Sequence, residues 1–135
     1  MTTQPSTIHD LREALDAYVS IYMPSRNFAP KTRQSYGDDI RELILFLESS
    51  GCDEAGEVSF TTLEGYLADL DRRKLAGATR RRKTYAIKSF FTFLHRSGHL
   101  PGNPAEQLIP PRSEQKEPRV LSKVEYQALL RAYTP

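Results

Sequence analysis

The chain has 135 residues and a formal net charge of +2, with 39% hydrophobic and 27% charged residues. This composition supports one domain with a packed core and excludes wholesale disorder, and no apolar run approaches the ~20 residues that span a bilayer. The N-terminus, MTTQPSTIHD, lacks the features of an export signal, and the single Cys52 excludes an intrachain disulfide, so we expect a cytoplasmic location and no membrane partner.

Charge is strongly segregated along the chain. Residues 38–71, the acidic block, hold ten acids and one base, whereas residues 72–105, the basic block, hold nine bases and no acid. The basic block indicates either an anionic partner or pairing with the acidic block inside the fold, and charge alone does not decide between the two.

The first predicted helix covers residues 7–23. Thr7 is its expected N-cap, and Pro24 is expected to end it. Its apolar positions recur at steps of three and four and should face the core: Leu11, Leu15, Tyr18, Val19 and Tyr22.

The second predicted helix begins at Pro30 and ends before Gly51. Its expected buried stripe is Tyr36, Ile40, Leu43, Ile44 and Leu47. Basic and hydroxyl residues crowd its first turns, where cations oppose the helix dipole, so these residues serve something other than helix stability: Lys31, Thr32, Arg33 and Ser35.

Two more helices follow. A capping box of Thr61 and Glu64 predicts a third helix that runs to about Lys74, with Gly77 in the next turn. The fourth is expected over residues 79–97, with a buried stripe of Thr84, Ile87, Phe91 and Leu94.

The remainder of the chain has linker composition up to a second capping box, Ser122 and Glu125, which predicts the start of a further helix. No stretch shows β alternation. The fold class is therefore all-α: a compact four-helix bundle over residues 1–108, a linker over 109–119, and the start of another domain over 120–135.

No catalytic constellation emerges from the sequence. It contains no Gly-rich phosphate loop, no H-E-x-x-H and no paired cysteines, and His9, His95 and His99 are scattered. We therefore expect no active site, no metal, no cofactor and no small-molecule substrate.

The stretch TRRRK, residues 79–83, opens the fourth helix. Thr79, Arg82, Lys83 and Ala86 fall on one helical face beside the core stripe, whereas Arg80 points elsewhere. Backbone N–H groups at a helix start and arginine side chains both attract phosphate, although a solvated basic turn is the competing interpretation. With the cluster at Lys31, the chain has two basic helix starts, and we expect them to flank one groove of a duplex. Solvated surface is the competing interpretation for the Lys31 cluster too.

These segments together resemble a known family. The stretches APKTRQSYGDDIRELILFLESSG, TLEGYLADLDRRKLAGATRRRKTYAIKSFFTFLHRSGHLPGNPAEQL and PRVLSKVEYQALLRA, in this order and spacing, are similar to the N-terminal core-binding domain of tyrosine recombinases, the Xer-type phage integrases. The resemblance covers the chain from about residue 8 to its end. Two departures are Thr84, where the family commonly has leucine, and Ala78, where a capping serine is common.

The resemblance implies a SAM-like DNA-binding domain that grips duplex DNA through its second and fourth helices during DNA recombination and integration. It implies DNA contacts at eight residues: Lys31, Thr32, Arg33, Ser35, Thr79, Arg80, Arg82 and Lys83. The family's catalytic residues lie in a C-terminal domain beyond this sequence, so we expect a chain that binds DNA and cuts nothing, with other recombinase protomers as partners in a tetramer on DNA. The alternative is a helical protein–protein interaction domain that uses its acidic and basic faces.

Overall fold

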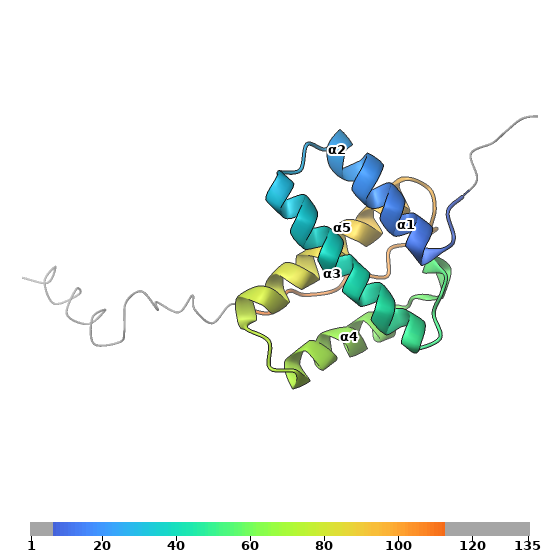
Figure 1. Ribbon diagram of the computed structural model, residues 1–135. Helices are drawn as coiled ribbons and strands as arrows, with labels where there is room; N and C mark the ends of the chain where they lie inside the picture. Colours follow the sequence, from blue (N-terminus) through green and yellow to red (C-terminus); the bar gives the residue numbers. More distant parts are fainter. Residues whose placement is uncertain (1–6, 113–135) are drawn as a thin grey trace, which may run out of the picture.

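The computed structural model describes residues 7–112 (Figure 1). Four helical stretches build the fold. In chain order these are α1 (Leu11–Ala17) continued by a π-helical turn (Tyr18–Tyr22) and α2 (Met23–Ser25), then α3 (Pro30–Ser49), α4 (Phe60–Arg72) and α5 (Gly77–Arg96). A short 3-10 turn, Ala55–Glu57, precedes α4. No strand occurs among residues 7–112, which confirms the all-α class.

The first helix differs from its prediction at both ends. Asp10, not Thr7, is the N-cap, and its carboxylate accepts a hydrogen bond from the Glu13 N–H at 3.0 Å. Pro24 lies inside the helical stretch rather than after it. Because proline has no N–H to donate to the preceding turn, the helix widens just before it, and the Met23 N–H bonds the Tyr18 carbonyl five residues back.

The start of α4 also differs from its prediction. Ser59 is the N-cap and accepts from the Thr62 N–H at 3.1 Å, so the capping box expected at Thr61 and Glu64 does not form. The helix ends at Arg72, two residues before Lys74, which adopts a φ of 58°.

The bounds of α3 agree with its prediction: Pro30 is its first residue, and Gly51 follows its end with a φ of 90°. α5 starts two residues earlier than predicted, because Gly77 is its first residue and not part of a turn. Gly98, with a φ of 81°, follows its C-terminus as expected.

The core lies where α3 crosses α5, with the first helix and α4 on either side (Figure 1). Tyr18 is fully buried among aromatic rings, 5.3 Å from Phe90 and 5.8 Å from Phe93 between ring centroids, and its hydroxyl bonds Ser89 at 2.7 Å. The predicted stripes supply many of the buried side chains: Leu11, Tyr18, Ile40, Leu43, Ile44, Leu47, Thr84, Ile87, Phe91 and Leu94. Other predicted stripe members are only half-buried: Leu15, Val19, Tyr22 and Tyr36. Leu63, Tyr66 and Leu70 of α4 and Phe90 of α5 complete the core.

The segment after α5 runs back along that helix toward its N-terminal end. The Lys88 ammonium donates to the carbonyls of Ala105, Glu106 and Leu108 at 3.1, 2.9 and 2.8 Å. The capping box expected at Ser122 lies outside the described residues. None of the helices described is long and apolar enough to cross a membrane.

Candidate nucleic-acid interface

The helices whose starts were predicted to bind phosphate, α3 and α5, begin without a side-chain cap. Their N-cap residues are Ala29 and Ala76, whereas Asp10 and Ser59 cap α1 and α4. The first N–H groups of α3 and α5 therefore donate to no capping side chain. Both first turns lie toward the same side of the molecule, at the left of Figure 1.

The cluster on α3 is open to solvent. Lys31 is exposed, and Thr32, Arg33 and Ser35 are half-buried. The Arg33 Nε donates to the Phe28 carbonyl at 2.8 Å, which fixes its side chain against the preceding loop. Within residues 7–112, neither Lys31 nor Arg33 pairs with a carboxylate, so their charges face outward uncompensated.

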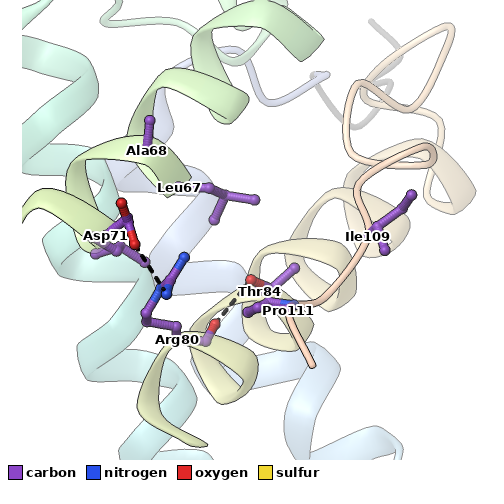
Figure 2. Close-up of a pocket in the computed structure, with 8 residues that line it drawn as sticks. Leu67, Ala68, Asp71, Arg80, Thr84, Ile109 and Pro111 are labelled. Carbon is purple, nitrogen blue, oxygen red and sulfur yellow. Dashed lines mark hydrogen bonds and ion pairs between the residues drawn. The ribbon is translucent and has the colours of Figure 1, made fainter. Parts of the chain in front are cut away.

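The residues in the first turns of α5 make more contacts within the protein than the cluster on α3 does. Thr79 is half-buried. Figure 2 shows Arg80 directed toward α4, where its Nη1 lies 3.3 Å from an Asp71 oxygen at the edge of a pocket. The buried Thr84 hydroxyl donates to the Arg80 carbonyl at 2.9 Å, so this polar residue is satisfied within the core.

Arg82 and Lys83 both bind Asp39 of α3, a carboxylate that is only 3% exposed. Arg82 forms a two-point contact, from Nε to Oδ2 at 2.9 Å and from Nη2 to Oδ1 at 2.8 Å. The Lys83 Nζ reaches the same Oδ1 at 3.0 Å. The hydrogen bonds that Arg82 donates to Asp39 raise the pKa of Arg82 above its ordinary value.

Lys83 also donates to Glu42, one turn further along α3, and Arg73 donates to the same carboxyl group at 2.7 Å. Burial alone would raise the pKa of Glu42, but the hydrogen bonds from Lys83 and Arg73 outweigh it and hold that pKa below its ordinary value.

The prediction that Lys83 and Ala86 lie on a face beside the core is wrong: Lys83 is 7% exposed and Ala86 is fully buried. Of Arg82, Lys83 and Ala86, Arg82 reaches the surface, with a side chain that is 43% exposed. The α5 helix is buried over a wider arc than an apolar stripe predicts, because Lys83 meets carboxylates of α3 instead of water.

Charge segregation therefore has a partly internal explanation. Several bases of the basic block pair with acids of the acidic block: Arg72 and Arg73 with Asp69, Arg73 with Glu42, Arg80 with Asp71, Arg82 with Asp39, and Lys83 with Asp39 and Glu42. Arg81 instead donates to the Pro111 carbonyl at 3.1 Å and holds the C-terminal segment on α5.

Sequence reasoning did not single out two tyrosines near these cations, and the Tyr85 hydroxyl accepts from Arg81 Nη2 at 3.2 Å. Tyr36 of α3 is half-buried and Tyr85 of α5 is 41% exposed. Burial raises the pKa of the Tyr36 hydroxyl, and the charge of Asp39 raises it further. Tyr36 was assigned to the core stripe, and nothing in the spacing of Tyr85 distinguished it from a solvated residue.

The structure gives structural contacts to two of the three histidines, His95 and His99. The His99 Nδ1 accepts from the Ile8 N–H at 3.0 Å, and the His95 Nδ1 lies 3.2 Å from the Leu100 carbonyl. Among residues 7–112, no group of three or more His, Cys, Asp or Glu side chains is arranged to hold a metal ion.

The sequence matches a known protein family over most of the described residues. The family described as "Phage integrase, N-terminal SAM-like domain" matches residues 15–98. The chain belongs to this family. Its relatives include tyrosine recombinase XerD of Caulobacter vibrioides, 31% identical over 117 residues, and tyrosine recombinase XerC of Roseiflexus sp., 28% identical over 120 residues.

The match covers 87% and 89% of this integrase-family chain but only 38% of each of those two relatives. The chain thus spans about two fifths of the length of the recombinases it resembles. No solved structure matches it significantly.

Proposed function

We propose that this domain binds duplex DNA as the N-terminal, non-cleaving part of a site-specific tyrosine recombinase. The observation that carries the proposal is the pair of uncapped helix starts, α3 and α5, on one side of the bundle (Figure 1). The exposed cations Lys31 and Arg82 lie in the first two turns of these helices. Free N–H groups at a helix start and nearby guanidinium or ammonium groups are the usual partners of DNA phosphates.

The proposed contact residues are Lys31, Thr32, Arg33, Ser35, Thr79 and Arg82, with Arg80 at the margin. Lys83, which is buried, supports Arg82 from behind and does not face the ligand. Most proposed contacts suit phosphate oxygens, so binding by this chain alone should be largely independent of DNA sequence and on the order of micromolar or weaker.

A salt titration tests this function. Fluorescence anisotropy with a labelled random-sequence duplex should give an affinity that falls steeply as salt rises, because each phosphate contact releases counterions. Lys31→Ala and Arg82→Ala should each weaken binding several-fold and flatten the logarithmic salt slope by about 0.9.

Arg96→Ala is the matched control. Arg96 is exposed at the opposite end of α5 and has no ion pair within residues 7–112. Its removal deletes the same charge, so an effect equal to that of Arg82→Ala would show that only net charge matters and would contradict the proposed face.

We also propose that this chain leaves DNA uncut, and that other recombinase protomers are partners of the intact protein, in a tetramer on DNA. Because the chain spans about two fifths of its recombinase relatives, the groups that break DNA would lie elsewhere in a longer protein. The alternative, a protein–protein interaction domain that uses its acidic and basic faces, is weakened because Asp39, Glu42 and Asp71 already pair with bases of this chain.

A further inference from the structure

A buried acid lies directly behind the proposed DNA-binding face. Asp39 is on α3, two turns after the cluster at Lys31, and its side chain is 2% exposed. By charge alone an acid at this place opposes the binding of an anion, and a buried carboxylate is costly unless it is paired and hydrogen-bonded.

The contact between Asp39 and Arg82 fixes the direction of the guanidinium group. The carboxylate takes one edge of the group, Nε and Nη2, at 2.9 and 2.8 Å. A guanidinium has five N–H donors in a rigid plane, so the donors that Asp39 does not use are directed away from the buried carboxylate and toward the exposed side.

The charge of Asp39 is balanced from inside the protein. Lys83 donates to Asp39 and to Glu42, and Glu42 also accepts from Arg73. Two carboxylates thus meet three cations in one network, so Arg82 keeps its positive charge available toward solvent.

From this geometry we propose that Asp39 is a positioning residue, which holds the Arg82 guanidinium in the orientation that binds a DNA phosphate. The inference rests on the proposed DNA-binding function. In this proposal the Arg82 side chain is already held in its binding orientation before DNA arrives. It therefore loses less conformational entropy on binding than a mobile surface arginine would.

A purely structural role and a positioning role for Asp39 predict opposite changes in DNA affinity when the residue is replaced by asparagine. If Asp39 only fills a structural ion pair, Asp39→Asn removes a negative charge and leaves DNA affinity unchanged or higher. If Asp39 positions Arg82, the same substitution weakens binding, even though the protein becomes more positive.

The experiment measures the affinity of the full 135-residue chain for a random-sequence duplex by anisotropy, across a series of salt concentrations. Asp39→Asn should weaken binding several-fold and flatten the logarithmic salt slope by up to about 0.9, the loss of one phosphate contact. The matched control is Asp38→Asn, because Asp38 is the exposed neighbour that pairs with Arg41 at 2.8 Å. This control makes the same charge change and should leave affinity equal or slightly higher.

Arg82→Lys keeps the proposal testable if Asp39→Asn fails to fold, since the Arg82 side chain is 43% exposed and lysine keeps its charge. Lysine keeps the charge but loses the two-point contact, so binding should fall several-fold. Wild-type affinity for Arg82→Lys, or for a folded Asp39→Asn, would overturn the positioning role alone. A wild-type chain that does not bind DNA would overturn the proposed function and this inference with it.

Discussion

At the scale of single residues, the ion pairs between α3 and α5 are the feature that organises the candidate site. Asp39 and Glu42 are three positions apart, so both project from one side of α3 toward the bases of the other helices. Sequence reasoning identified Arg82 and Lys83 as cations of interest, but it could not choose their partners. The pairs join residues more than 40 positions apart, and such pairing depends on how the helices cross.

The lowered pKa of Glu42 makes stability depend on pH. The unfolded chain binds a proton at Glu42 near the ordinary pKa of 4.5, whereas the folded chain binds it only at lower pH. The contribution of ionised Glu42 to the stability of the fold is therefore fully present above pH 4.5. It is lost as the pH falls through the pKa that Glu42 has in the folded chain.

Glu42→Gln tests this pH dependence through urea unfolding midpoints between pH 7 and pH 3. The variant should be less stable than the wild type at pH 7, and the difference should shrink progressively below pH 4.5. Glu64→Gln, at an exposed position with no ion pair within residues 7–112, should match the wild type throughout. A difference between Glu42→Gln and wild type that stays constant over this range would contradict the account.

At the scale of the helices, helix type and the apolar faces were largely predictable from the sequence, whereas several helix ends were not. Pro30 and Gly51 bracket α3 as expected, because each residue has a strong and specific backbone preference. The α4 start was assigned to Thr61 instead of Ser59, because both offer a hydroxyl and only the loop geometry selects between them. Pro24 was taken as a helix end because a π-helical turn has no clear sequence signal.

The uncapped start of α5 gives a prediction in which stability and DNA binding change in opposite directions. Ala76→Asp supplies a carboxylate cap and should stabilise the fold by about 0.5–1 kcal/mol, but it places a negative charge where a phosphate is proposed to bind. We therefore expect a higher melting temperature together with several-fold weaker DNA binding.

The control for this experiment is Thr61→Asp, which adds the same charge to the first turn of α4, a helix that already has its cap in Ser59. The α4 start lies at the other end of the bundle from the α5 start (Figure 1). Equal loss of DNA affinity in both variants would contradict a phosphate site at α5.

At the scale of the whole molecule, internal ion pairs explain much of the segregated charge, and the DNA partner proposed above would account for the rest. Much of the basic block is used internally, through pairs with the acidic block and through the Lys88 and Arg81 contacts to the C-terminal segment. Within residues 7–112, the cations without an ion pair are fewer than the sequence suggests. They include Lys31 and Arg33 at the start of α3, but also Arg96 at the C-terminal end of α5. Family membership and fold class followed from the order of the motifs, while the selection among cations required the three-dimensional structure.

The most direct test of the central claim is a titration of the 15N-labelled chain with a short duplex, followed by amide chemical shifts. If the starts of α3 and α5 bind DNA, the shifts should concentrate at residues 31–35 and 77–82. They should be small at His95 and Arg96 and should diminish when salt is raised. Shifts centred on the opposite end of α5, or spread evenly over the surface, would contradict the claim.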